Sequence, residues 1–296
     1  MFAEKGFVSM KYYLVTTNHF SEKLLFKDDD DYKAGMNFTP LAARSIDVLV
    51  LAFILMSTHM HYVLGCNNKD EALAFITKMK LLYGGYFGQK YGQRTYLRRL
   101  KVDIQELDTE DEIPEWAIAY VLMNSVAAKI SLDASGYPWG SGACYFNQTA
   151  IRGTSLENMS WRAIVAKVHS KLDTDPGWIM ADEGYIDPRS YISVRIVEKL
   201  YRTPTRMIYF LKNSSKAKKR LETSAGLPAF SDQVVQGGVK DLCATLFGML
   251  SPAGLAVNEK TELVKQLQRR FSADISQICR TTGISHNDAV RMLDSM

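Results

Sequence analysis

The first half of the chain contains short apolar runs bounded by polar residues, and their composition is that of β-strands. Residues 10–17 (MKYYLVTT) and 46–57 (IDVLVLAFILMS) are rich in β-branched and aromatic side chains, and HMHYVLG continues from residue 59 after a short break. Too few residues join the second strand to the third for a crossover helix. The sequence therefore predicts an antiparallel sheet.

Helical periodicity follows these strands. Residues 70–92 repeat apolar side chains at helical spacing and end at glycines. A proline opens a second helix over 114–130 that is apolar on nearly all sides, so we expect it in the core. Two acidic stretches, 28–31 and 103–115, are expected to be exposed loops.

From about residue 155 the pattern is mainly helical. Residues 189–212 and 262–271 have the spacing of amphipathic, basic helices. The sequence thus predicts an α+β protein, with helices packed on an antiparallel sheet and a mainly α-helical C-terminal region. The predicted regions are 1–150 (α+β domain), 151–225 (basic and helical) and 226–296 (helical).

Composition narrows the cellular setting. The four cysteines are scattered without a CxxC pair, which is typical of a reducing compartment rather than of a disulfide framework. The longest apolar run, Val48–Met56, is nine residues, far below the roughly 20 that span a bilayer. The N-terminus mixes acids and bases and has no clear signal-peptide core. We expect a cytoplasmic protein with no membrane partner.

The net charge of +4 is unevenly distributed. Residues 189–220 hold ten basic side chains and one acid, Glu198. Such a block is either a solvated helical face or a phosphate-binding surface, since clustered lysines and arginines release counterions from nucleic acid. The charge pattern leaves both interpretations open.

Two of the five histidines, His59 and His61, follow the longest apolar run. Side chains alternate along a strand, so the two imidazoles share one face while Met60 and Tyr62 occupy the other. Two imidazoles so placed can bind one divalent metal. The alternative is a pair of hydrogen-bonded histidines on a polar sheet face, and the His-x-His pattern alone does not separate the two.

Three further segments add a resemblance. FILMSTHMHYVLG (53–65) resembles the hydrophobic-Met-Pro-Asn-His-x-His strand of the single-tyrosine HUH transposases, which include insertion-element and REP-associated enzymes. AYVLMNSVAAKI (119–130) and GYPWGSGACYF (136–146) are similar to that family's tyrosine helix and the turn after it. Residues 79–101 resemble its basic helix and following segment. The resemblance covers residues 10–146 in the family's order.

The resemblance implies roles for individual residues. His59 and His61 match the metal-binding histidines, Tyr120 the nucleophilic tyrosine, and Asn124 a further metal ligand. Asn124 stands four residues after Tyr120, on the same helix face. Tyr83 is the reserve candidate for the nucleophile. Tyr86 and Tyr91 are further rivals on the same helix.

The implied reaction is the cleavage and rejoining of single-stranded or hairpin DNA through a 5′-phosphotyrosine, with Mg²⁺ or Mn²⁺ as the metal. The implied fold is an HUH domain of ferredoxin-like or RRM-like type. A homodimer is a further implied partner arrangement, since the tyrosine helix of some members packs onto a partner's site. The predicted DNA-binding residues are Lys80, Arg94, Arg98, Arg99, Lys101, Arg202 and Arg206.

The chain departs from the family pattern next to the site residues. Ser57 and Thr58 replace the family's Pro-Asn, and Ser125 replaces the proline after the asparagine. These departures leave the four site residues intact. They put the substrate contacts in doubt.

Residues 275–296 have a helix–turn–helix rhythm, with a turn at Thr282-Gly283-Ile284 and a cap at Ser285. In a DNA reader the second helix enters the major groove, and a plain helical hairpin is the alternative. Two other functions stay open: a non-catalytic DNA-binding protein that keeps the fold, and a metal-dependent phosphoesterase in which the histidine pair activates water.

Overall fold

A four-stranded antiparallel sheet forms the centre of the first part of the molecule. In the computed structural model the strands lie in the order β2-β3-β1-β4, and each neighbouring pair is antiparallel. The strands are β1 (Lys11–Thr17), β2 (Leu49–Met56), β3 (His59–Cys66) and β4 (Val102–Leu107). The structure describes residues 10–17, 24–92, 97, 100–107, 113–128, 130–213, 232–271 and 273–294, and every structural statement below concerns these.

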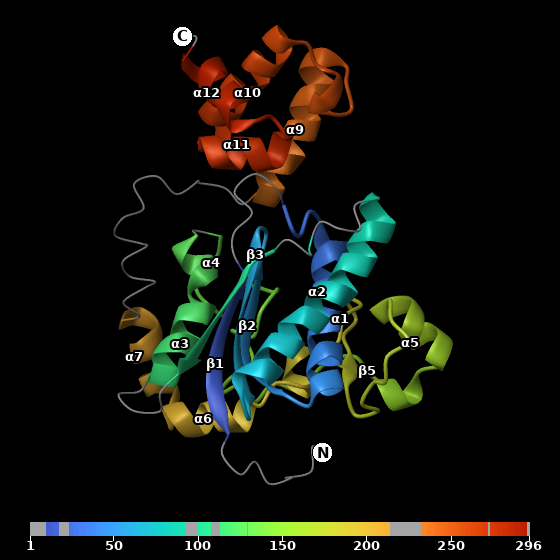
Figure 1. The fold of residues 1–296 in the computed structure, drawn as a ribbon, viewed down its shortest axis with the longest axis vertical. Helices are drawn as coiled ribbons and strands as arrows, with labels where there is room; N and C mark the ends of the chain where they lie inside the picture. Colours follow the sequence, from blue (N-terminus) through green and yellow to red (C-terminus); the bar gives the residue numbers. More distant parts are fainter. Residues whose placement is uncertain are drawn as a thin grey trace.

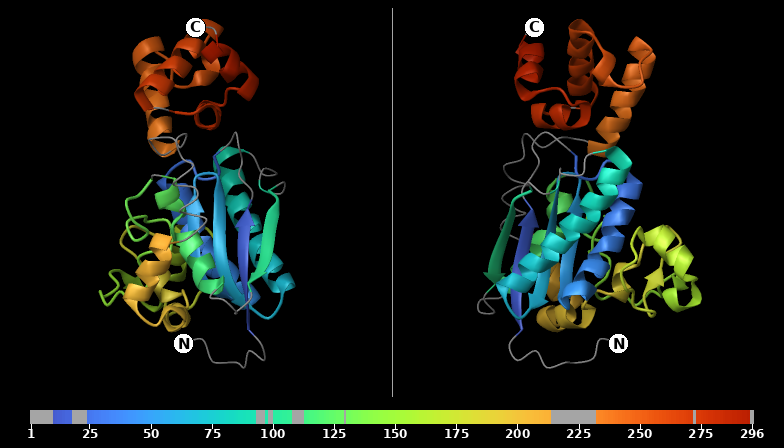
Figure 2. Two further views of the ribbon diagram at one scale, coloured as in Figure 1. Left: turned by 90° about the vertical axis from the view of Figure 1, so that its left-hand side faces the viewer. Right: turned by 45° about the vertical axis from the view of Figure 1, so that its right-hand side comes forward.

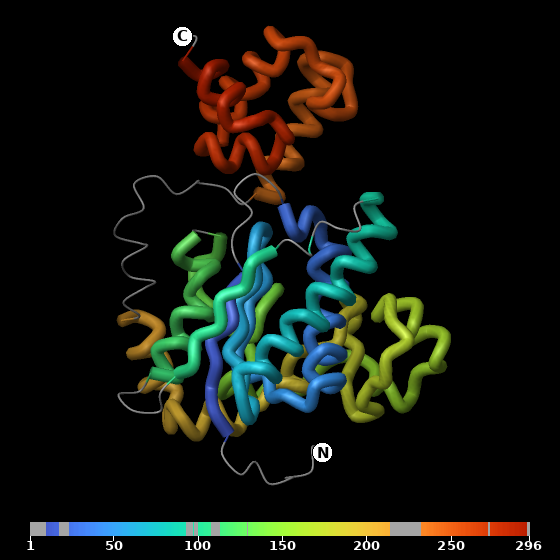
Figure 3. The backbone as a smooth tube through the Cα atoms, in the orientation of Figure 1, coloured from blue at the N-terminus to red at the C-terminus, as the bar shows by residue number. Residues whose placement is uncertain are grey.

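Helices cover both faces of this sheet (Figure 1). The long helices α1 (Asp29–Ile46) and α2 (Lys69–Tyr91) pack together on one face. On the opposite face lies α3 (Ile113–Leu122), against which α7 (Pro204–Asn213) packs. The tube in Figure 3 follows the chain from β1 through α1 to the β2–β3 hairpin, and through α2 to β4. The predicted α+β class with an antiparallel sheet is confirmed.

The acidic stretch at 28–31 begins a helix, so the expectation of a loop there is wrong. The side chain of Asp28 caps α1 by accepting the backbone N–H of Asp31 at 3.0 Å. Carboxylates are favourable in a first helical turn because the orphan N–H groups carry partial positive charge. Pro40 lies inside this helix and masks its periodicity in the sequence.

The second acidic stretch is also not a simple loop. Residues 103–107 belong to β4, an edge strand paired with β1. Charged side chains are common on edge strands because they discourage pairing with other chains. Residues 108–112 lie outside the described part of the chain, and α3 begins at Ile113.

The predicted helix over 114–130 is interrupted. It forms α3 up to Leu122, and a short helix α4 (Asn124–Ala127) follows after Met123. The turn-rich segment after α4 covers the free edge of β2, where Leu55 N donates to Trp139 O at 2.8 Å and Ser141 N to Phe53 O at 3.0 Å.

A region of short elements follows and packs on the same core. Buried side chains between residues 156 and 210 belong to one hydrophobic cluster with those of the sheet and its helices. The predicted boundary near residue 150 therefore does not separate two cores. The elements are β5 (Thr154–Ser155), α5 (Trp161–Val168), β6 (Ile179–Met180) and α6 (Val194–Tyr201).

A second hydrophobic cluster holds the C-terminal helices, which stand apart from the sheet layers in both views of Figure 2. We call residues 232–294 the C-terminal unit. Its last two helices meet at Gly283, whose φ of 76° is the left-handed conformation that glycine adopts without strain. The predicted pair of helices with a turn between them is present, and its assignment as a DNA-reading helix–turn–helix stays a prediction. The helices are α9 (Asp232–Phe247), α10 (Val257–Phe271), α11 (Ile275–Thr282) and α12 (His286–Asp294).

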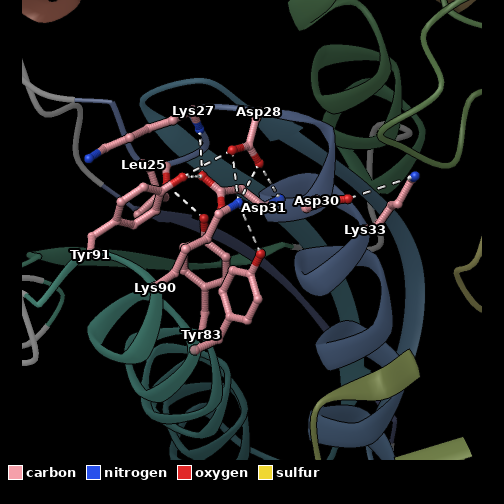
Figure 4. Close-up of polar contacts among 10 residues, drawn as sticks. Leu25, Lys27, Asp28, Asp30, Asp31, Lys33, Tyr83, Lys90 and Tyr91 are labelled. Carbon is pink, nitrogen blue, oxygen red and sulfur yellow. Dashed lines mark hydrogen bonds and ion pairs between the residues drawn. The ribbon is translucent and has the colours of Figure 1, made fainter. Parts of the chain in front are cut away.

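A partly buried ionic cluster joins α1 to α2 (Figure 4). Lys90 Nζ lies 2.6 Å from Asp28 Oδ1 and 2.8 Å from Asp31 Oδ1, and the side chain of Asp31 is fully buried. Tyr91 donates its hydroxyl to Asp31 Oδ2 at 2.9 Å.

No described helix is both long and apolar enough to span a membrane.

Candidate functional site

The face that each β3 side chain occupies follows the alternation expected from the sequence. Tyr62 faces α2, where its ring packs edge-on against Phe75 with centroids 5.0 Å apart. Its hydroxyl donates to the sulfur of Met60 at 3.7 Å, so both side chains lie on that face. His61 points to the other face, where its ring meets Tyr120 of α3.

His59, His61 and Tyr120 form a continuous cluster of rings between β3 and α3. The two imidazole centroids are 4.7 Å apart with ring planes at 89°, and the centroids of His61 and Tyr120 are 5.4 Å apart at 77°. His59 is 4% exposed and His61 1%, whereas Tyr120 is only partly buried. Segments about 60 residues apart in the sequence thus supply one site.

Two threonines hold the imidazoles. Thr58 Oγ1 lies 3.0 Å from His59 Nδ1, and Thr16 Oγ1 lies 3.0 Å from His61 Nδ1. A hydrogen bond at Nδ1 fixes the ring orientation and presents Nε2 to a ligand, as outer partners of metal-binding histidines do. The Nε2 atoms of both rings are buried.

Sequence reasoning did not find these threonines. Thr58 was visible only as a departure from the family pattern. Thr16 stands directly opposite His61 in the pairing of β1 with β3. That register is a non-local property, so the sequence alone carried no clear signal for Thr16.

Asn124 lies beside the backbone of the tyrosine helix. It is 2% exposed, and its amide nitrogen donates to the carbonyl oxygens of Tyr120 at 2.8 Å and Val121 at 3.4 Å. These carbonyls lie in the last turn of α3. In a continuing helix they would accept backbone N–H groups from the next turn, and after the interruption at Met123 the side chain of Asn124 donates to them. That Asn124 shares a metal with His59 and His61 stays a prediction.

The reserve tyrosine lies in the other helical layer. Tyr83 is fully buried on α2, and its hydroxyl donates to the carbonyl of Leu25 at 2.7 Å. Burial raises the pKa of Tyr83 well above its usual value, with nearby Asp31 adding to the effect. Tyr86 and Tyr91 share this helix. The geometry therefore favours Tyr120 as the tyrosine that accompanies the histidines.

The predicted DNA-binding residues are divided between two layers. Lys80 belongs to α2, where Nζ donates to the carbonyl of Leu100 at 2.6 Å and burial lowers the pKa of the ammonium. Arg206 belongs to α7, with its guanidinium carbon 5.3 Å from the ring centroid of Phe210. Lys101 and Arg202 are exposed. Arg94, Arg98 and Arg99 lie outside the described residues.

Within the described part of the chain, no group of three or more His, Cys, Asp or Glu side chains can hold a metal ion. The predicted donor set contains two such residues, because its third member is the amide of Asn124. An amide oxygen is a ligand that suits Mg²⁺ or Mn²⁺, whereas imidazole nitrogens suit Zn²⁺, Fe²⁺ or Ni²⁺, so the predicted set combines both kinds of donor. Binding of Mg²⁺ or Mn²⁺ by this set stays a prediction.

Comparison of the chain with protein-family models, curated proteins and solved structures found no match. The resemblance to the single-tyrosine transposases therefore depends on the sequence motifs.

Proposed function

We propose that this chain is a transposase-like enzyme that cleaves and rejoins single-stranded DNA by metal-assisted attack of Tyr120. The observation that carries the proposal is the ring contact between Tyr120 and His61, with His59 against His61. The two segments that resemble the family's separate motifs lie together, on the sheet face that the strand alternation requires.

The arrangement of the strands supports the finer fold assignment. The elements follow the order β1-α1-β2-β3-α2-β4, and the strands lie in the order β2-β3-β1-β4. A β-α-β-β-α-β sequence of elements is that of the ferredoxin-like, or split βαβ, arrangement. This agreement is the support for an HUH domain of that type.

In the proposed reaction the Tyr120 hydroxyl oxygen bonds to the phosphorus of a phosphodiester, and the bond from phosphorus to the 3′ oxygen breaks. The phenol loses its proton and the departing 3′ oxygen gains one, which leaves a 5′-phosphotyrosine and a free 3′-OH. Attack by a 3′-OH on the phosphotyrosine reverses the step and rejoins a strand. No external energy source is needed, because one phosphoester replaces another.

His59 and His61 would hold the ion through their Nε2 atoms, since the threonine hydroxyls engage Nδ1. Asn124 would add its amide oxygen. When bound, Mg²⁺ or Mn²⁺ supplies neutralisation of the charge that develops on the scissile phosphate. Arg202 and Arg206 lie at α6 and α7 on the α3 side of the sheet, and they are the proposed contacts for the DNA backbone there.

The test is the formation of a covalent adduct. The full chain is incubated with Mg²⁺ or Mn²⁺ and a labelled library of hairpin single strands with randomised loops, and a denaturing gel then separates protein-linked label. We expect an adduct with the wild type and none with Tyr120→Phe. Tyr209→Phe is the matched control, because Tyr209 is 57% exposed on α7.

Other results would contradict the proposal in distinct ways. An adduct that persists in Tyr120→Phe would place the nucleophile elsewhere. Metal-dependent cleavage without an adduct, retained in Tyr120→Phe, is the result expected of a phosphoesterase that uses the histidine pair. DNA binding with neither cleavage nor adduct is the result expected of a non-catalytic DNA-binding protein.

A further inference from the structure

Asp232, the first residue of α9, has a buried carboxylate that accepts hydrogen bonds from three side chains. Asp232 is 5% exposed and accepts Gln277 Nε2 at 2.8 Å and Arg280 Nε at 3.0 Å, both from α11. Its third partner comes from the other core, since Ser57 Oγ donates to Asp232 Oδ2 at 2.9 Å. A carboxylate accepts several donors at once, so one group serves both parts of the molecule.

Ser57 belongs to the turn that precedes the histidines. The carbonyl of Ser57 accepts the N–H groups of Leu25 at 2.7 Å and Phe26 at 3.1 Å, which fixes one side of the turn. The next residue, Thr58, contacts the Nδ1 of His59. Two successive residues therefore connect Asp232 of the C-terminal unit to the ring of His59.

The junction between the two parts is polar in this region. The hydrophobic cluster of the C-terminal unit shares no described residue with that of the sheet and its helices. Within the described residues, no helix of the C-terminal unit packs extensively on an element of the first core. Hydrogen bonds to a charged group are strong enough to influence such a docking equilibrium.

We propose that Asp232 is a positioning residue, which docks the C-terminal unit onto Ser57 and thereby sets the orientation of His59. The α11 helix, which carries Gln277 and Arg280, is the first helix of the helix–turn–helix pair. Any ligand that moves this pair changes the constraint on the turn next to His59. The docking itself does not depend on the proposed DNA chemistry, whereas its effect on catalysis does.

Ser57→Ala tests the junction, because it removes the bond between the two parts and leaves the contacts of Asp232 with Gln277 and Arg280 intact. Ser57→Thr restores a hydroxyl. Ser45→Ala is the matched control, since Ser45 donates to Leu41 within α1. All three are made in the full chain.

Two measurements, both made without DNA, report the effect of each variant on docking and on His59. Spin labels at Leu132→Cys and Leu250→Cys report the distance between the two parts; these positions are 98% and 92% exposed, and the four native cysteines are buried. The imidazole NMR signals report the environment of His59, with His169, which packs on Tyr86 of α2, as an internal reference.

We expect Ser57→Ala to shift the docking equilibrium by about tenfold to a hundredfold toward undocked distances, the range for a hydrogen bond to a charged group. The same variant should shift the His59 signals and leave His169 unchanged, and Ser57→Thr should restore both. An unchanged distance distribution, or an unchanged His59 signal beside an altered distance, overturns the proposal. Failure of the DNA adduct test in the wild type leaves these readouts unaffected.

Discussion

Two threonine hydroxyls hold the imidazoles of His59 and His61, one from the β2–β3 turn and one from the neighbouring strand. At the scale of single residues, the departures from the family pattern have structural roles here. Thr58 contacts His59, and Ser57 contacts Asp232. The positions where the family has Pro-Asn thus orient one histidine and connect the two parts of the chain.

Replacement of Thr16 by valine tests the role of these hydroxyls. Thr16→Val keeps the shape of the side chain but removes the group that holds Nδ1 of His61. We expect affinity for Mn²⁺ to fall by about 10- to 100-fold, as is typical when an outer partner of a metal-binding histidine is lost. Electron paramagnetic resonance of free Mn²⁺ measures this affinity.

The control is Thr77→Val, at an exposed position on α2. Equal Mn²⁺ affinity in Thr16→Val and in this control would show that the hydroxyl does not support a metal site.

At the scale of elements, the cluster around Lys90 joins the start of α1 to the end of α2. Burial alone would lower the pKa of Lys90, but hydrogen bonds to Asp28 and Asp31 outweigh it and hold this pKa above its usual range. Burial alone would likewise raise the pKa of Asp28, yet hydrogen bonds from Lys90 and from the N–H of Asp31 lower it. Each charge therefore favours the ionised form of the other.

Lys90→Met should destabilise this helix pair. Removing one partner of a fully buried ion pair costs ~3–5 kcal/mol, and we expect about 2–3 kcal/mol here because 28% of the Lys90 side chain is exposed. Urea unfolding at pH 7 measures the change in the free energy of unfolding. Lys78→Met, at a partly buried position of the same helix, is the control.

The difference between wild type and Lys90→Met should depend on pH. The difference in the free energy of unfolding should be largest between about pH 4 and pH 10, where Asp28 and Lys90 are both ionised in the folded and unfolded chains. Below about pH 4 it should shrink as the pH falls through the lowered pKa of Asp28, and above about pH 10 as the pH rises through the raised pKa of Lys90. A difference that is constant from pH 3 to 7 would contradict an ionic origin.

At the scale of the whole molecule, two hydrophobic clusters divide the described chain. One extends from β1 to α7 and the other from α9 to α12. Units with separate cores open with separate free energies when their interface is small and polar. We therefore expect the C-terminal unit to unfold without the sheet.

Leu267→Ala tests this independence, because Leu267 is fully buried in the second cluster. The cavity should cost about 2–5 kcal/mol of stability. Hydrogen exchange followed by mass spectrometry should show faster exchange within residues 232–294 and unchanged protection in β2 and β3. Leu246→Ala, at a 44% exposed position of α9, should change little. Equal loss of protection in β3 would show that the two parts form one cooperative unit.

Local patterns in the sequence determined much of the sheet and the face that each β3 side chain occupies. The β-branched and aromatic composition predicted β1 and β3 nearly to the residue. The alternation of side chains along a strand then put His59 and His61 on one face, because residues two apart point the same way. Helical periodicity and glycines predicted α2 and the turn between α11 and α12 in the same local way.

Tertiary structure decided the features that depend on distant partners. Lys90, about 60 residues away in the sequence, pairs with Asp28 and Asp31 of the acidic run, and 103–107 became a strand because β1 offers it an edge. The side of the sheet on which each tyrosine lies follows from helix packing, which separates Tyr120 from Tyr83. Thr16 and Asp232 reach the histidine region only through strand register and domain docking. Propensity and periodicity are local properties of a chain, whereas these contacts join residues far apart in it.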